Sequence, residues 1–236
     1  RSFNRPMRAV LSRPAPLPPA ADEAPRPDRK AAILLAAEKL FAQHGYHAVS
    51  IRQIAAEAGV PLALVGYYYG AKHELFHAIF AHWQPTIEAR LALLREAVAQ
   101  TQARPAALHR IVSAFVEPVL QMRASPEGEF YALLVSRELL YVRDETDRVL
   151  RDFFDPLAHA FIDALHTMRP QATRAQTAWS YQFALGALLH HTSDRRVQRL
   201  SRGANAPNDA AAAPLLIRFI TAGLDAALQA PPTHPD

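Results

Sequence analysis

Residues 50–72 read SIRQIAAEAGVPLALVGYYYGAK, and this stretch predicts two short helices joined by a tight turn. Ser50 is suited to cap the first helix, because Gln53, three residues later, can return a hydrogen bond to the Ser50 backbone in a capping box. Gly59 can adopt the left-handed conformation that a sharp turn between helices needs. Pro61 is typical of the first turn of the following helix. The pattern therefore indicates a helix-turn-helix, which is a DNA-reading unit.

The second short helix is expected to have one inward and one outward face. Val65 and Tyr69 lie four residues apart, so they share a face of the helix and are expected to point to the core. The outward or sideways positions are then Leu62, Ala63, Gly66, Tyr67 and Tyr68. Gly70 ends the helix and Lys72 follows it. A lysine at this point can neutralise a DNA phosphate.

Residues 29–76 resemble the N-terminal domain of the TetR family of bacterial transcriptional regulators. The resemblance rests on a first helix ending in LFAQHGY, on SIRQIAAEAGV, and on a short helix that closes on YYYGAKHELF. In that family the second short helix enters the DNA major groove, while the helix cap, the aromatic end and the lysine hold phosphates. By position, the resemblance implies DNA contacts for Ser50, Arg52, Gln53, Leu62, Ala63, Leu64, Gly66, Tyr67, Tyr68 and Lys72.

The chain departs from the family pattern inside this segment. Gly66 stands where many members have a tyrosine that grips a phosphate, and Tyr68 stands where histidine is usual. Leu62 replaces a residue that is frequently polar and reads a base. Ala71 lacks the hydroxyl commonly found before the lysine. These departures bear on individual DNA contacts more than on membership of the family.

The 236-residue chain carries a formal net charge of +4, and all of it lies in the first 30 residues. Residues 1–30 hold seven Arg or Lys against three acids, which leaves 19 of each sign in residues 31–236. A basic arm is a sequence-independent aid to DNA binding, although a merely solvated tail has the same composition. Residues 1–27 are crowded with Pro, Ala and Arg, so we expect them to be disordered.

Several classes of site are excluded by composition and spacing. The chain has no cysteine, so a disulfide framework, a thiolate nucleophile and zinc-finger spacing are absent. No nucleophile elbow, phosphate loop or metal-ligand pattern is found, and the adjacent His190 and His191 cannot easily share one metal ion. The uncharged run at residues 175–193 is too polar for a membrane span. We predict a cytoplasmic protein with no catalytic residue, cofactor, metal or membrane partner.

The fold class predicted from the hydrophobic periodicity is all-α. A first helix is expected between Asp28 and Gly45, and a helix after Lys72 is expected to kink or break at Pro85. Further helices are predicted at residues 105–122, 127–141, 144–167, 173–192 and 209–228. The expected domains are a disordered arm at 1–27, a helix-turn-helix domain at 28–82, a helical effector-binding and dimerisation domain at 83–229, and a disordered tail at 230–236.

The last two predicted helices are apolar on more than one side. One apolar face can serve the core of the chain, so the other needs a partner, and this resembles the four-helix dimer interface of the TetR family. The predicted homodimer interface consists of Trp179, Phe183, Gly186, His190, Leu216, Phe219, Ile220 and Gly223.

Aromatic side chains in the C-terminal domain are candidates to line a pocket for a mostly apolar small-molecule effector. Arg137, Glu138 and His109 are possible polar anchors for such a ligand. Ordinary core packing is the competing interpretation of every one of the aromatic residues. The candidate pocket residues are Trp83, His109, Phe115, Met122, Phe130, Tyr131, Arg137, Phe153 and Phe154.

Two classes of function remain. The first, which the resemblance implies, is a dimeric regulator that binds double-stranded DNA, most often as a repressor that a small-molecule effector releases from a palindromic operator. The second is a helical small-molecule-binding protein or enzyme with a vestigial reading head. Specific binding to duplex DNA separates the two, because only the first requires it.

Overall fold

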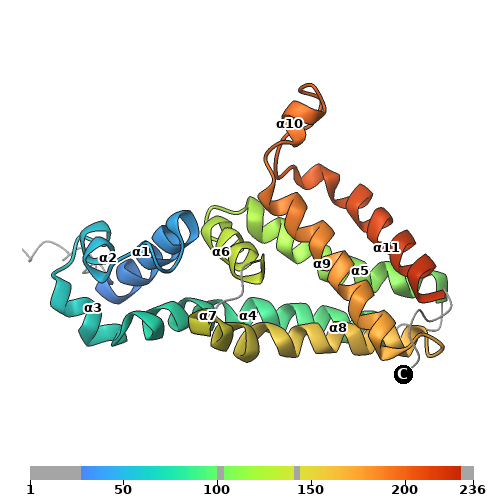
Figure 1. The fold of residues 1–236 in the computed structure, drawn as a ribbon, viewed down its shortest axis with the longest axis horizontal. Helices are drawn as coiled ribbons and strands as arrows, with labels where there is room; N and C mark the ends of the chain where they lie inside the picture. Colours follow the sequence, from blue (N-terminus) through green and yellow to red (C-terminus); the bar gives the residue numbers. More distant parts are fainter. Residues whose placement is uncertain (1–27, 100–103, 141–143, 230–236) are drawn as a thin grey trace, which may run out of the picture.

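The computed structural model describes residues 28–99, 104–140 and 144–229, and every regular element within these ranges is a helix. The prediction of an all-α fold is therefore confirmed. The three N-terminal helices form one end of an elongated molecule, and the long helix α4 (Lys72–Ala99) connects them to the helices at the other end (Figure 1).

The first helix, α1 (Arg29–His44), begins and ends as predicted. The Asp28 carboxylate accepts hydrogen bonds from two backbone N–H groups of the first turn, and Gly45, with a φ of 86°, follows the last turn. The buried Phe41 ring meets the Phe76 ring of α4 edge to face, with the centroids 5.3 Å apart. This contact fixes α1 against α4 and makes α1 the brace of the DNA-reading helices.

Helices α2 (Ile51–Glu57) and α3 (Leu62–Tyr69) form the predicted helix-turn-helix. Gly59 adopts a positive φ of 65° between them. The N–H of Val60 donates to the carbonyl of Ala55 across 3.0 Å, which is the long hydrogen bond of a Schellman motif. The turn therefore satisfies the carbonyls at the end of α2 and sets the angle at which α3 leaves it.

Helix α4 excludes a break at Pro85, which was one of the two alternatives predicted there. The helix runs from Lys72 to Ala99 with Pro85 inside it, so it is not interrupted there. Proline removes a hydrogen bond to the carbonyl four residues earlier, which belongs to Ala81. Both Pro85 and Ala81 are exposed, so water can reach that carbonyl and the helix continues. As a result, a single helix extends from the reading head into the C-terminal domain, and the predicted domain division after residue 82 falls within it.

The remaining helices form the C-terminal domain (Figure 1). The longer ones are α5 (Arg104–Ala124), α6 (Glu129–Leu140), α8 (Asp155–Met168), α9 (Arg174–Ser193) and α11 (Ala213–Gln229). The shorter ones are α7 (Asp144–Val149), α10 (Val197–Leu200) and a 3-10 turn, η2 (Ala210–Ala212). Helix α10 lies in the projecting connection between α9 and α11 (Figure 1), where no separate helix was predicted.

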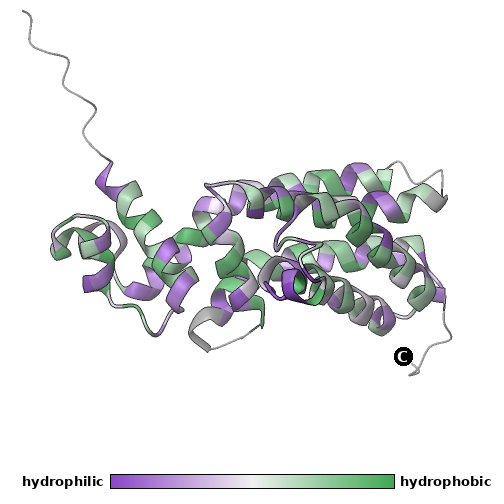
Figure 2. Ribbon diagram, turned by 90° about the horizontal axis from the view of Figure 1, so that it is seen from above, coloured by the Kyte–Doolittle hydropathy of each residue, from purple (hydrophilic) through white to green (hydrophobic). Residues whose placement is uncertain are grey.

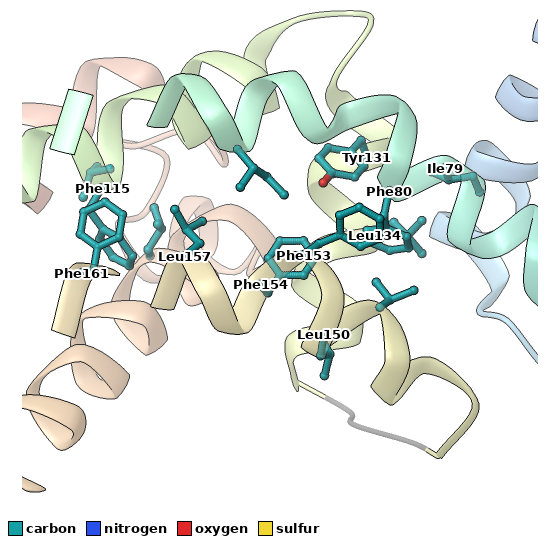
Figure 3. Close-up of a cluster of buried hydrophobic side chains, with 14 of the residues drawn as sticks. Ile79, Phe80, Phe115, Tyr131, Leu134, Leu150, Phe153, Phe154, Leu157 and Phe161 are labelled. Atoms are coloured by element: carbon teal, nitrogen blue, oxygen red, sulfur yellow. The ribbon is translucent and has the colours of Figure 1, made fainter. Parts of the chain in front are cut away.

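The single helix predicted over residues 144–167 contains an irregular turn. A π-helical turn, η1 (Leu150–Phe154), separates α7 from α8. Phe153 and Phe154 are neighbours in sequence, yet both are buried, and both lie near Phe80 of α4. Figure 3 shows these rings within the aromatic and aliphatic cluster that fills the C-terminal domain. Such turns are frequent at functional sites, and this one borders the cavity described below.

Hydrophobic and hydrophilic residues recur along the helices of both domains (Figure 2). Within the described ranges, none of the helices combines the length and the apolar character that a membrane span requires. The predicted disordered segments at residues 1–27 and 230–236 lie outside the described residues.

Candidate DNA-binding surface and ligand cavity

The outward face of α3 is fixed by what its inward face contacts. Val65 is fully buried, and the Tyr69 hydroxyl donates a hydrogen bond to the carbonyl of Lys30 in α1 across 2.9 Å. Burial, with a smaller contribution from the charge of Asp28, raises the pKa of Tyr69 to about 12. The hydroxyl therefore stays neutral and donating at physiological pH, and α3 is held on α1.

This anchoring leaves the predicted DNA-contacting side chains of α3 at the surface. The exposed positions are Leu62, Ala63, Gly66, Tyr67 and Tyr68. Tyr67 is 79% exposed, and its ring meets that of Tyr68 edge to face at 5.1 Å. Leu64 differs from the others, because it is half-buried and packs against the core. The surface is therefore an apolar and aromatic ridge with two phenolic hydroxyls.

The N-terminus of α2 has the predicted capping box. The backbone N–H of Gln53 donates to Ser50 Oγ (3.3 Å), and the backbone N–H of Ser50 donates to Gln53 Oε1 (2.8 Å). The Gln53 amide nitrogen is left as a donor that can face a phosphate. Arg52, between the two capping residues, is exposed. One guanidinium and one amide donor are therefore exposed at the start of α2.

Lys72 is held in position by aromatic rings at the start of α4. Its Nζ lies 4.3 Å from the centroid of the Tyr46 ring and 5.9 Å from that of Phe41. Partial burial lowers the pKa of Lys72 from its ordinary value. A cation over an aromatic face is attracted by the ring, so the amine is oriented in the absence of DNA. Tyr46 was not predicted as a site residue, although it lies in the LFAQHGY segment.

The start of α4 is partly occupied by an acidic side chain. Glu74 Oε2 accepts a hydrogen bond from the backbone N–H of Ala71 across 2.6 Å. Gly70 has a φ of 69°, a left-handed backbone conformation that favours glycine, and a Cβ there would also displace the Glu74 carboxylate. The N–H of Ala71 is already satisfied, and Lys72 is therefore the stronger candidate for a phosphate contact at this end of α3.

A cavity of about 120 Å³ lies inside the C-terminal domain. Residues from α4, α5, α6, α8, α9 and the π-helical turn line it, and most of them are apolar. Phe115, Met122, Tyr131 and Phe154 were predicted as pocket residues and are part of its wall. Arg90 of α4 and Tyr181 of α9 also line it and were not predicted.

The other predicted pocket residues lie elsewhere. Trp83 and Phe130 border an open hollow beside α1, and His109 borders a separate hollow between α5 and α11. Phe153 packs against His77 and Phe80 in the core. Arg137 donates a hydrogen bond to the carbonyl of His44 at the end of α1 (3.4 Å). The predicted residues therefore do not form one pocket, and Arg137 links the C-terminal domain to the reading head.

Trp83 connects the cavity wall to α1. Its ring stacks on that of Tyr131 with a centroid distance of 4.8 Å and an interplanar angle of 12°. Its Nε1 donates to Glu38 Oε2 of α1 across 2.7 Å. Glu38 is buried, and this burial raises the pKa of its carboxyl to about 6, although the hydrogen bond from Trp83 opposes the shift. One unbroken series of contacts thus runs from the cavity to the brace of the DNA-reading helices.

Both domains match known sequence families. Residues 33–79 match the family described as "Bacterial regulatory proteins, tetR family", and residues 113–223 match "Tetracyclin repressor-like, C-terminal domain". The first segment covers the three-helix reading head and the second covers most of the C-terminal helices. The chain belongs to the TetR family. It is therefore a transcriptional regulator with a helix-turn-helix DNA-binding domain.

A curated relative of this TetR-family chain is the HTH-type transcriptional activator FasR of Mycolicibacterium smegmatis (strain ATCC 700084 / mc(2)155). The two sequences are 30% identical over 93 residues, which is 39% of this chain and 41% of the relative. The match thus spans about two-fifths of the length of that relative.

Solved structures show the same fold at low sequence identity. A TetR-family regulator from Bordetella parapertussis 12822 has a TM-score of 0.59 at 16% identity, over 83% of this chain and 95% of that one. The fatty acid degradation regulator FadR from Bacillus halodurans has a TM-score of 0.55 at 16% identity, over 85% and 98%. FadR from Bacillus subtilis, solved in complex with stearoyl-CoA, has a TM-score of 0.51 at 14% identity, over 82% and 98%.

TetR-family regulators form dimers, and the residues predicted for that role divide between surface and core. Trp179 and Phe183 of α9 are 62% and 66% exposed, and Phe219 of α11 is 69% exposed. Gly186, His190 and Gly223 are also exposed, and Leu216 is half-buried. Ile220 is only 3% exposed and belongs to the core of the protomer itself. We call the exposed Trp179, Phe183, Leu215 and Phe219 the α9–α11 face.

The two histidines of α9 have different surroundings, and the buried Nε2 of His191 has no hydrogen-bond partner among the described residues. His190 lies 3.0 Å from the carboxylate of Asp194, and burial lowers the pKa of the adjacent His191. Among the described residues, no group of three or more His, Asp or Glu side chains is arranged to hold a metal ion.

Proposed function

We propose that this regulator is a homodimeric repressor that releases a palindromic operator when a small molecule enters the C-terminal cavity. The observation that carries the proposal is the contact series from Tyr131, in the cavity wall, through Trp83 to Glu38 on α1. The proposal places the protein in the cytoplasm with its DNA and gives it no catalytic role.

The size of the cavity explains how a ligand would act. Ligand sites in proteins typically measure roughly 300–1,000 Å³, whereas this cavity holds about 120 Å³. An effector must therefore move the walls apart as it binds. Tyr131 belongs to α6, and α6 also contacts the end of α1 through the Arg137 hydrogen bond. Displacing α6 would shift α1 and the reading head relative to α4.

The α9–α11 face supports the dimer. Its large apolar side chains lie on two helices that contact each other, and a contiguous apolar patch of this kind marks an association surface. A two-fold axis through it would give two identical reading heads. Identical heads related by such an axis read half-sites that are palindromic and about one helical turn, or a multiple of a turn, apart.

The proposed direction of regulation follows from the packing at the junction. We call the structure with the small cavity the closed state. In it, α6 and Trp83 hold α1 through the Arg137 and Glu38 hydrogen bonds. A head that is held rigidly loses less entropy when it binds DNA, so we assign DNA binding to this closed state. A ligand that opens the cavity then favours release. The relative FasR is an activator, so whether this protein represses or activates transcription has to be determined separately.

The proposal is tested by gel-shift assays on DNA flanking the protein's own gene, with and without candidate small molecules. We expect a shifted complex that excess scrambled DNA does not compete away and that an effector dissolves. Tyr67→Ala should abolish it, whereas Leu93→Ala, a control at an exposed position on α4, should not. A protein that binds ligands but never prefers a DNA sequence would instead be a helical binding protein or enzyme with a vestigial reading head.

A further inference from the structure

Arg90 is a charged residue in the wall of an apolar cavity. It lies on α4, and its Nε is buried without a hydrogen-bond partner among the described residues. Its Nη2 donates to the carbonyl of Phe115 at 3.3 Å, and its guanidinium carbon lies 5.9 Å from the Phe115 ring centroid. A guanidinium has five N–H donors, so these contacts leave most of its hydrogen-bonding capacity unused.

The charge of Arg90 is also unbalanced. Within the described residues, no carboxylate lies within ion-pair distance of it. Asp155 lines the same cavity but is exposed and makes no ion pair with Arg90. Two other arginines of the same domain are paired with carboxylates, Arg123 with Glu129 (3.0 Å) and Arg169 with Asp225. Arg90 therefore differs from these two arginines.

A second donor without an acceptor lies in the same cavity wall. The Tyr131 hydroxyl is buried and has no hydrogen-bond partner among the described residues. Burial raises the pKa of Tyr131 well above its ordinary value, so this group remains a neutral donor. Burial likewise lowers the pKa of Arg90, because a charge without a counterion is disfavoured there. Buried polar groups are normally satisfied, so these two lack a group that an acceptor-rich ligand would supply.

We infer that the cavity binds an amphipathic carboxylic acid, whose carboxylate is held by Arg90 and Tyr131. We infer the chemical class of the effector of the proposed regulator, so the inference rests on the proposed function. A guanidinium matches a carboxylate with two parallel N–H donors. A single negative charge balances the single charge of Arg90, whereas a phosphate dianion would leave a buried excess charge.

The rest of the wall fits an apolar tail. Val119, Met122 and Leu139 line one part of the cavity, and Leu185, Leu188 and Leu189 line another. In Figure 3 the lining residues Leu157 and Phe154 lie between Phe115 and Tyr131 along the buried cluster. Methionine and leucine side chains can change rotamer to admit a chain longer than the resting cavity accepts. The site thus combines one charged end with an adaptable apolar body.

Calorimetry on the purified full chain without DNA tests this inference. The ligands are straight-chain acids from butyrate to palmitate, each paired with the primary alcohol of the same chain length. We expect at least one acid to bind tenfold or more tightly than its alcohol. Arg90→Met should remove that preference, Tyr131→Phe should weaken it, and Arg90→Lys should retain part of it.

Thermal unfolding without ligand separates a binding role from a structural one. Arg90→Met should raise the melting temperature, because it replaces an unpaired and partly buried charge with an apolar side chain of similar length. Arg123→Met, which removes the paired arginine, should lower it. If no acid binds more tightly than its alcohol, or if the preference survives in Arg90→Met, the inference is wrong.

The inferred ligand class and the proposed function can fail independently of each other. An acid that binds through Arg90 but leaves operator binding unchanged would support this inference and contradict the proposed function. Release of operator by an uncharged molecule, with no binding of any acid, would do the opposite.

Discussion

At the scale of single residues, Lys72 shows how the DNA surface is preorganised. Its amine lies over the Tyr46 ring, so little side-chain freedom is left to lose on DNA. Lys72→Ala should weaken binding to all duplex sequences alike and reduce the log–log salt slope by about 1 per half-site contact. Fluorescence anisotropy at several salt concentrations measures both quantities.

A matched control is available in the same domain. Lys39 is paired with Glu57 at 2.6 Å, so Lys39→Ala should change the salt slope little. A Lys72→Ala protein that lost discrimination between matched and mismatched sites, with an unchanged slope, would show that Lys72 reads bases instead.

Glu38 predicts a pH dependence of stability. Its pKa rises from 4.5 to about 6 on folding, so the folded state binds its proton more tightly than the unfolded state. Its contribution to stability is therefore fully present below about pH 4.5 and is lost as pH rises through 6. A rise in pKa from 4.5 to about 6 corresponds to roughly 2 kcal/mol of folding free energy. Urea unfolding of the wild type and of Glu38→Gln should show the variant gaining about this much relative to the wild type between pH 4.5 and 7.5. A constant difference between the two proteins across that range would contradict the assignment.

Single residues also show where sequence reasoning ends. The capping pair Ser50 and Gln53 could be predicted, because its hydrogen bonds span three residues of one chain segment. The role of Arg90 in the cavity could not be predicted, because Arg90 lies among ordinary helical residues. Its position in the cavity wall depends on α5, α6 and α9, which follow later in the sequence. The same holds for Trp83, which pairs with Glu38 across 45 residues.

At the scale of helices, the existence of most elements could be predicted and their irregularities could not. Amphipathic periodicity and caps located the long helices. The continuation of α4 through Pro85 depends on the exposure of Ala81, which is a tertiary property. The π-helical turn at Leu150–Phe154 likewise has no signal in the periodicity, because both Phe153 and Phe154 turn toward α4 only in the packed molecule.

The contact between α4, α6 and α1 predicts how coupling can be weakened. Trp83→Phe keeps an aromatic ring against Tyr131 but removes the Nε1 hydrogen bond to Glu38. We expect ligand binding to persist while the effect of the ligand on operator affinity falls by about 0.5–2 kcal/mol. Anisotropy titrations of operator DNA, with and without saturating effector, measure this. Phe130→Leu alters the same hollow without touching that bond and is the control. Full coupling in Trp83→Phe would place the route elsewhere.

At the scale of the whole molecule, the exposed α9–α11 face predicts the oligomer. A charge placed in a buried apolar interface is strongly unfavourable. Phe183→Glu should therefore sediment as a monomer, keep its helical circular dichroism and lose affinity for the full palindrome. Leu93→Glu introduces the same charge at an exposed apolar position on α4 and should remain dimeric. A folded Phe183→Glu protein that still sediments as a dimer would place the interface on another surface.

Coupling between the cavity and the reading head is tested most directly by linkage. Calorimetry of the effector, performed on the dimer with and without a saturating operator duplex, compares two affinities of one ligand for one protein. A regulator released by its effector must bind that effector about 5- to 150-fold more weakly when operator is bound, by the same factor that the effector weakens operator binding. Equal effector affinity in the two titrations would contradict the coupling.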